Sequence, residues 1–207
     1  MSREVDTPHG PARVHEQPVD DARALLVLGH GAGGGVTAPD LVIAAKVANE
    51  AGLSVALVEQ PYRVAGRRSA APAHQLDAAW TAVVEAVRGD LPVLCGGRSS
   101  GARVACRTAA ATGAAGVLCL AFPVHPPGRP EKTRLAELDA VAVPVLVVQG
   151  ERDPFGMPPA APGRTVAVVQ GDHGLKADRA AIAEAIRAWL DRTAGATTSP
   201  ARSAGPA

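Results

Sequence analysis

Short apolar segments alternate with longer amphipathic segments through most of the chain. The apolar segments are four to seven residues long, and glycine, proline or polar residues follow each of them, which is typical of buried strands. We predict strands at 24–28, 54–58, 92–95, 116–122, 144–148 and 165–169. Such alternation predicts an α/β fold, with a mostly parallel sheet and helices on both of its faces.

The amphipathic segments predict helices at about 39–51, 73–88, 100–111 and 178–191. The last is the clearest, because Ile182, Ile186 and Trp189 share one face that would pack on the sheet. Pro39 marks a helix start, since the missing N–H of proline is no loss in a first helical turn. Residues 1–20 predict a weak edge hairpin.

The length of 207 residues suits one domain, which we place at 1–193. Small and polar residues dominate 194–207, so we expect a disordered C-terminal tail there. Many related folds carry a cap at the position of 123–143, but this segment has room for only one short helix, near 131–138. We therefore expect no cap domain and an open pocket.

Charge and composition exclude several classes of partner. The chain has 21 Lys and Arg against 20 Asp and Glu, too little net charge to hold a nucleic acid backbone. No apolar run approaches the roughly 18 residues of a membrane span, and the N-terminus resembles no signal peptide. Cys95, Cys106 and Cys119 lie in apolar segments without metal-binding spacing. We expect reduced core cysteines, no metal, no membrane and a cytoplasmic location.

The most specific chemical signal is a GxSxG motif, Gly97 to Gly101, between a predicted strand and a predicted helix. In a nucleophile elbow, the serine occupies a strained turn between strand and helix, and the flanking glycines allow close backbone packing. A chance GxSxG in a glycine-rich chain is the alternative. In this context, the motif predicts Ser99 as a nucleophile.

An acid and a base follow two later strands. Asp153 comes after the strand at 144–148, and His173 comes after the strand at 165–169. A serine needs an imidazole to accept its proton, and the imidazole needs a carboxylate to hold it. The order Ser99, Asp153, His173 predicts a catalytic triad, with Glu151 and Asp172 as alternative acids.

The glycine-rich segment 29–35 supports two interpretations. It predicts an oxyanion loop, in which the N–H groups of Ala32 and Ser100 bind the oxygen of a tetrahedral intermediate. It also satisfies GxGxxG, with Glu59 as a ribose-binding acid, as in dinucleotide-binding proteins. Residues 36–39 separate the glycines from the helix, and the dinucleotide interpretation leaves the triad unexplained, so we favour the oxyanion loop. A P-loop is excluded, because no Lys-Ser/Thr follows.

The segments HGAGGG, GGRSSGARVA, VQGERDPFG and GDHGLK together resemble the α/β-hydrolases, over about residues 20–191. More narrowly, the chain resembles the small lidless branch related to dienelactone hydrolase. Segments 60–63 and 122–128 are similar to hydrolase-like testis-expressed proteins and to a subunit of the NSL acetyltransferase complex. A larger residue often follows the nucleophile in these families, where this chain has Ser100.

The resemblance implies hydrolysis of an ester, thioester or related acyl bond through a Ser99 acyl-enzyme, without cofactor or metal. The expected partner is a small acyl substrate. A hydrolase fold used as a binding or scaffold module is the alternative, since fold does not determine function.

Candidate substrate contacts lie on two loops that would border the pocket. Tyr62 and Arg63, with Arg67 and Arg68, follow the strand at 54–58, and an arginine there would bind a carboxylate or phosphate. His125 is the candidate contact on the second loop. The alternatives are ordinary solvated arginines and a structural His125 beside two prolines.

Overall fold

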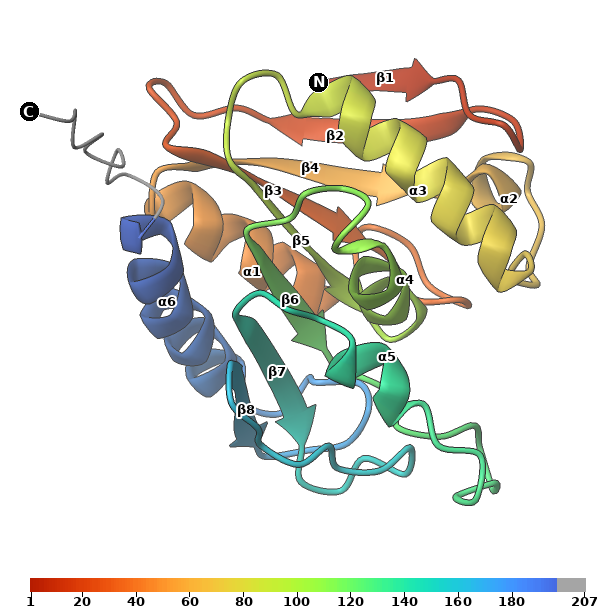
Figure 1. Ribbon diagram of the computed structural model, residues 1–207, viewed down its shortest axis with the longest axis vertical. Coiled ribbons are helices and arrows are strands. Elements are labelled where there is room, and N and C mark those ends of the chain that lie inside the picture. The colour runs from red at the N-terminus through yellow and green to blue at the C-terminus, as the bar shows by residue number, and fades with distance from the viewer. Residues whose placement is uncertain (197–207) are drawn as a thin grey trace, which may run out of the picture.

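One eight-stranded sheet forms the centre of the computed structural model, which describes residues 1–196 (Figure 1). Its strands are β1 (Ser2–Val5), β2 (Ala12–Gln17), β3 (Ala24–Gly29), β4 (Leu53–Glu59), β5 (Val93–Arg98), β6 (Gly116–Leu120), β7 (Val145–Gly150) and β8 (Arg164–Val169). The helices are α1 (Pro39–Glu50), α2 (Pro61–Val64), α3 (Ala73–Val87), α4 (Ser100–Thr108), α5 (Leu135–Asp139) and α6 (Arg179–Ala196).

The sheet order is β1-β2-β4-β3-β5-β6-β7-β8. All neighbours from β4 to β8 pair in parallel, whereas β1 and β2 form an antiparallel hairpin that extends the β4 edge. The six predicted strands and the weak N-terminal hairpin are thus confirmed. Because β3 to β8 are parallel, their carboxyl ends meet at one edge of the sheet, where ligands bind in open α/β sheets.

Alternating residues of the central strands feed two separate cores. In β6, Val117 and Cys119 pack beneath α3 and α4, while Leu118 and Leu120 pack beneath α1 and α6. Figure 1 shows these helix pairs on opposite faces of the sheet. This two-sided burial explains why the parallel strands read as almost continuous apolar runs.

The helices largely follow the predicted pattern. Ile182, Ile186 and Trp189 of α6 are buried against the sheet, which confirms the predicted apolar face. Helix α4 is shorter than predicted and ends at Thr108 rather than at 111. Similarly, β6 ends at Leu120, because Ala121 has a φ of +51° and leaves the strand conformation.

No cap domain is present in the described part of the chain. The connection from β6 to β7 contains only the short helix α5, near the predicted place. Helix α6 continues to Ala196, so the first residues of the predicted tail are helical, and the rest of that tail lies outside the described residues.

Two further expectations concern membranes and cysteines. Within residues 1–196, we find no helix that combines the length and the apolar character needed to cross a bilayer. Cys95, Cys106 and Cys119 are all buried, as their apolar surroundings predicted, and none of the three is drawn in a disulfide within the described residues.

Candidate active site

Ser99, His173 and Asp153 form one hydrogen-bonded chain at the carboxyl edge of the sheet. The Nε2 atom of His173 lies 3.0 Å from the Ser99 hydroxyl oxygen. On the other side of the ring, Nδ1 lies 2.8 Å from Oδ2 of Asp153. The strands β5, β7 and β8 end side by side, which brings together residues that are far apart in the sequence.

Ser99 occupies a strained turn between β5 and α4. Its φ of +52° lies in the left-handed region, which non-glycine residues rarely adopt. A Cβ added at Gly97 would lie 2.5 Å from the carbonyl oxygen of Gly29, and one added at Gly101 would lie 2.4 Å from the same atom. Both glycines of the motif are therefore required for the close approach of α4 to the end of β3.

Asp153 is held by neighbours as well as by His173. Its side chain is 1% exposed. Oδ1 accepts a hydrogen bond from the Phe155 N–H at 2.9 Å, and Oδ2 accepts one from Nε2 of Gln149 at 2.9 Å. These donors stabilise the carboxylate and fix its orientation. Gln149, on the buried end of β7, carries no sequence signal and was not predicted as part of the site.

The two alternative acids do not contact the imidazole. Glu151 is exposed and pairs with its neighbour Arg152. The exposed Asp172 accepts a hydrogen bond from the N–H of Gly174 at 2.8 Å. Of the three candidate acids, Asp153 alone is bonded to His173.

Arg98, the first variable residue of the GxSxG motif, contacts the loop that carries His173. Its guanidinium donates to the carbonyl oxygen of His173 at 2.9 Å and pairs with the fully buried Asp40 at 3.0 Å. Burial raises the pKa of Asp40, and the positive charge of Arg98 opposes that shift. Phe155 packs on the His173 ring, with centroids 4.3 Å apart. Nothing in the local sequence indicated that Arg98 and Phe155 contact His173, or that Asp40 pairs with Arg98.

The glycine-rich segment after β3 lies against the nucleophile. A Cβ added at Gly31 would be 3.6 Å from that of Ser99. Ala32 and Ser100 line the same cavity as Ser99, and within residues 1–196 neither backbone N–H has a protein acceptor. Tyr62 holds this loop, because its hydroxyl donates to the Ala32 carbonyl oxygen at 3.0 Å.

His30 fixes the conformation of this loop from inside the fold. Its Nδ1 lies 2.8 Å from the Gly31 carbonyl oxygen, and its Nε2 lies 3.1 Å from the Gln60 N–H. Only a neutral ring with its proton on Nδ1 satisfies both partners. Burial lowers the pKa of His30, which is consistent with that neutral state.

The dinucleotide interpretation of the glycines does not fit this arrangement. Helix α1 begins only at Pro39, so its first turn is separated from the glycine positions by several residues. Glu59 is already paired, with Oε2 lying 3.2 Å from Nε2 of His15 and 3.8 Å from Arg13. The carboxylate expected to bind a ribose therefore faces the antiparallel strand β2.

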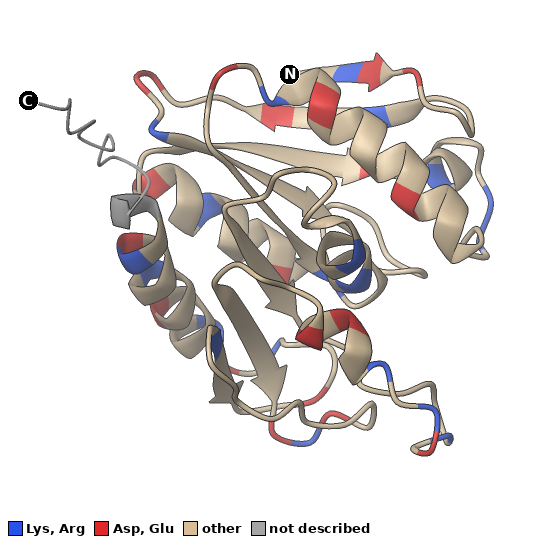
Figure 2. Cartoon of the chain, in the orientation of Figure 1, with Lys and Arg blue, Asp and Glu red and all other residues tan. Residues whose placement is uncertain are grey.

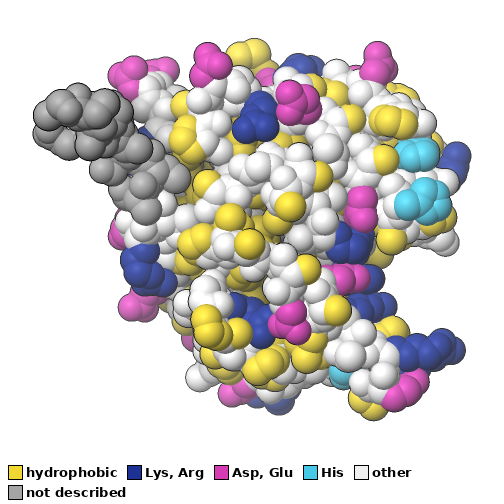
Figure 3. Space-filling view, in the orientation of Figure 1, with side chains coloured by type: hydrophobic (Ala, Val, Ile, Leu, Met, Phe, Trp, Pro, Cys, Tyr) yellow, Lys and Arg dark blue, Asp and Glu magenta, His cyan; other side chains and the backbone are white. Residues whose placement is uncertain are grey.

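A cavity of about 250 Å³ opens beside Ser99. Its wall combines apolar residues with three arginines, and its lining residues are Ala32, Ala70, Ala71, Ala73, Leu76, Ser99, Ser100, Arg103, Arg107, Pro123, Arg134 and Phe155. Figure 3 shows basic and acidic side chains gathered where the surface is hollowed over α4 and α5. We call this the Ser99 cavity.

Two arginines of the Ser99 cavity form salt bridges with carboxylates. Arg103 forms a bidentate pair with Glu137, at 2.8 and 2.5 Å, and Arg107 forms one with Asp77, at 2.8 and 2.6 Å. Figure 2 shows the basic bands of α4 facing the acidic bands of α5. Arg134 forms no salt bridge within residues 1–196. Sequence reasoning singled out none of these arginines.

The predicted substrate contacts lie elsewhere. Tyr62, Arg63 and His125 are absent from the lining of the Ser99 cavity, so their contact with substrate stays a prediction. His125 instead lies 2.9 Å from the Pro126 carbonyl oxygen through Nδ1. Tyr62 borders a second cavity, of about 320 Å³.

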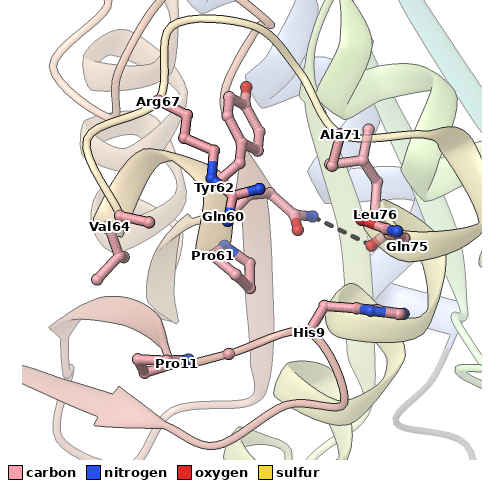
Figure 4. A pocket seen from close by; sticks show the side chains of 12 residues that line it. His9, Pro11, Gln60, Pro61, Tyr62, Val64, Arg67, Ala71, Gln75 and Leu76 are labelled. Atoms are coloured by element: carbon pink, nitrogen blue, oxygen red, sulfur yellow. Dashed lines mark hydrogen bonds between the residues drawn. The ribbon is translucent and has the colours of Figure 1, made fainter.

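Figure 4 shows this second cavity, which we call the Tyr62 cavity. Its wall comes from the β1–β2 turn, α2 and the start of α3, with Gln60 donating to the Leu76 carbonyl oxygen at 3.3 Å. Neither Ser99 nor His173 lines it. The cavity has no nucleophile and base arranged as beside Ser99.

No clustered metal ligands accompany the site. Within residues 1–196, no group of three or more His, Cys, Asp or Glu side chains is placed to hold a metal ion. The chemistry that the described geometry offers is nucleophilic, with a serine hydroxyl next to an oriented imidazole.

Comparison with known proteins identifies the family. The family model of the alpha/beta hydrolase domain matches residues 22–197, and the chain therefore belongs to the α/β-hydrolases. No curated protein matches the chain by sequence. The predicted fold class and the resemblance to lidless hydrolases are confirmed.

Several solved structures share the fold. A lidless α/β serine hydrolase from Xanthomonas campestris is 20% identical, with a TM-score of 0.73 over 93% of this chain and 94% of its own. Est1E from Butyrivibrio proteoclasticus is 14% identical, with a TM-score of 0.76 over 94% and 99%. A dienelactone hydrolase from Anabaena variabilis is 16% identical, with a TM-score of 0.72 over 93% and 97%.

The similarity to testis-expressed and NSL-complex proteins stays a prediction. At these identities, the solved structures define the fold alone. The reaction must be argued from the residues of this chain.

Proposed function

We propose that this α/β-hydrolase is a serine hydrolase that cleaves an ester, thioester or related acyl bond of a small substrate in the cytoplasm. One observation carries the proposal, namely the hydrogen-bonded chain from Ser99 through His173 to the buried Asp153. A serine hydroxyl is a weak nucleophile until a base accepts its proton.

Acylation begins with attack by Ser99 on the substrate carbonyl carbon. As the bond forms, Nε2 of His173 takes the hydroxyl proton across the 3.0 Å contact. The resulting imidazolium keeps its Nδ1–H bonded to Asp153, whose negative charge stabilises it. Loss of the alcohol or thiol, which receives the proton from Nε2, leaves an acyl group on Ser99.

The oxyanion of the tetrahedral intermediate lies between the glycine-rich loop and α4. We assign its two hydrogen bonds to the N–H groups of Ala32 and Ser100, which have no protein acceptor within residues 1–196. The first turn of α4 adds the positive end of a helix dipole.

Deacylation reverses these roles. A water molecule gives a proton to Nε2 of His173 and attacks the acyl carbon, and Ser99 recovers its proton when the acid leaves. Every proton in the cycle moves through one nitrogen, so no cofactor is required by this scheme.

Covalent labelling tests the proposal directly. A fluorophosphonate probe should label the wild-type protein, and mass spectrometry should locate the label on Ser99. Ser99→Ala should remove the label and reduce ester hydrolysis roughly 10³- to 10⁶-fold, because triad members act as a unit. Ser100→Ala is the matched control and should keep the label, since it preserves the backbone N–H. Absence of label and hydrolysis in the folded wild type would instead support a binding module.

A further inference from the structure

Arg134 is the one guanidinium of the Ser99 cavity that lacks a carboxylate partner within residues 1–196. Arg103 and Arg107 are each held by bidentate pairs with Glu137 and Asp77. Three arginines thus face two carboxylates, which leaves one positive charge at the cavity wall. That charge has no structural partner to explain it.

The position of Arg134 is set by its backbone and by its neighbours. Its N–H donates to the Val124 carbonyl oxygen at 2.7 Å, immediately before α5 begins. Burial lowers the pKa of Arg134, the positive charges of Arg103 and Arg107 act in the same direction, and Glu137 opposes them. An anion bound here would relieve this repulsion.

The distance from the reactive serine can be judged from the helix. Arg103 and Arg107 follow Ser99 at intervals of four residues, so they lie on one face of α4. At 1.5 Å per residue, these positions are about 6 and 12 Å along the helix from Ser99. The arginine end of the cavity is thus within reach of a substrate of a few carbons whose carbonyl group lies at Ser99.

The rest of the cavity wall is apolar enough to contact the methylene groups of such a substrate. Leu76, Ala71 and Phe155 are among the apolar residues that line the cavity together with the serine and the arginines. A volume of about 250 Å³ lies just below the range of common ligand pockets and suits an acyl group of a few carbons.

We propose that the Ser99 cavity binds an acyl group that ends in a free carboxylate, as in a half-ester or half-thioester of a short dicarboxylic acid, with Arg134 as the anion-binding residue. This inference rests on the proposed serine hydrolase function and names its substrate class. The guanidinium fork matches a carboxylate in two hydrogen bonds, while the apolar wall covers the methylene groups.

Paired esters test the substrate class. The probes are the mono-4-nitrophenyl ester of glutaric acid and 4-nitrophenyl pentanoate, which have acyl chains of equal carbon number. The wild type should show the higher kcat/KM for the glutarate ester. In Arg134→Gln, the ratio of the two kcat/KM values should fall about tenfold, mainly through KM of the anionic ester. Arg134→Lys should lose less, because it keeps the charge.

Two arginine variants serve as matched controls. Arg129→Gln removes an exposed charge from the same segment, outside the cavity, and should leave the ratio within twofold. Arg63→Gln tests the loop after β4, which the sequence offered as a candidate anion-binding site, with ordinary solvated arginines as the alternative. An unchanged ratio in Arg134→Gln, or an equal fall in Arg129→Gln, would overturn the proposal. A fall only in Arg63→Gln would move anion binding to the loop after β4.

A binding measurement separates this inference from the proposed function. Monomethyl glutarate should bind to Ser99→Ala in calorimetry, and the double variant Ser99→Ala, Arg134→Gln should bind it about tenfold more weakly. Binding through Arg134 without Ser99-dependent hydrolysis would refute the hydrolase proposal and retain the anion site. Ser99-dependent hydrolysis without an Arg134 effect on binding or on the kcat/KM ratio would support the hydrolase proposal and refute the anion site.

Discussion

The two cavities at the carboxyl edge of the sheet differ in chemistry more than in size. The Tyr62 cavity has a volume of about 320 Å³ and the Ser99 cavity about 250 Å³, and Ala71 and Leu76 line both. The larger cavity contains polar side chains, but only the smaller one reaches a nucleophile bonded to a base. Volume alone would therefore have selected the wrong cavity for the proposed reaction.

The arginines of the two regions show the same contrast. Arg63, Arg67 and Arg68 are close in sequence, yet of these only Arg67 lines either of the two cavities. Arg103, Arg107 and Arg134 are dispersed along the chain and meet at one wall. Charge density along a sequence is thus a poor guide to charge density at a site.

After Ser99→Ala, the largest effect should come from Asp153, the acid behind the Ser99 cavity. Asp153→Asn should fold normally and lose about 10³- to 10⁴-fold in kcat, because an amide favours the wrong histidine tautomer and cannot stabilise the imidazolium. Ester hydrolysis and thermal unfolding measure the two properties. Glu151→Gln is the matched control, and a comparable loss in that variant would transfer the acid role to Glu151.

Arg98 should have the next largest effect, because it joins the histidine loop to α1. Arg98→Met should reduce kcat/KM roughly 10- to 100-fold through a displaced His173. It should also lower the free energy of unfolding by about 3 kcal/mol, since Asp40 loses its buried partner.

The double variant Arg98→Met, Asp40→Asn separates these two effects. It should recover most of the stability without recovering activity, as measured by urea unfolding and by ester hydrolysis. Full recovery of activity would show that Arg98 acts only through stability, not by positioning His173.

His30 lies between the two regions and should give a smaller, pH-dependent effect. Burial lowers its pKa in the folded protein below the ordinary histidine value of about 6.5, so the folded state prefers the neutral ring. The unfolded chain binds the proton first as pH falls. The contribution of neutral His30 to the free energy of unfolding is therefore complete above about pH 6.5 and is lost progressively below it.

Urea unfolding between pH 7.5 and pH 5 measures this dependence. The wild type should lose stability over this range, and His30→Gln should lose less, because the variant has no ring to titrate at this position. An identical pH dependence in the two proteins would assign the loss to other groups.

The smallest effect should come from the Tyr62 cavity. His9→Ala and Arg67→Gln should each leave kcat/KM for both nitrophenyl esters within twofold, since neither residue lines the Ser99 cavity. A tenfold loss in either variant would show that the substrate extends beyond the shared wall into the Tyr62 cavity. That result would contradict the conclusion that only the Ser99 cavity binds the substrate.

The sequence by itself determined the order of strands and helices and the places of the candidate triad. Parallel strands buried on both faces read as apolar runs, and whatever follows such strands must lie at one edge of the sheet. Ser99, Asp153 and His173 each follow a predicted strand, so their meeting could be predicted without knowing any distance. The two glycines of the GxSxG motif, Gly97 and Gly101, are likewise a local signal that can be read from the sequence.

Only the tertiary structure decided what surrounds the candidate triad. Gln149, Phe155 and Arg98 support Asp153 and His173 through contacts that depend on how separate elements pack. Likewise, Arg134 faces the Ser99 cavity because the segment before α5 folds back toward α4. Long polar side chains reach partners from many backbone positions, and their sequence pattern has no period. Their contacts are therefore determined by three-dimensional packing, whereas the order of strands and helices along the chain follows from local hydrophobic patterning.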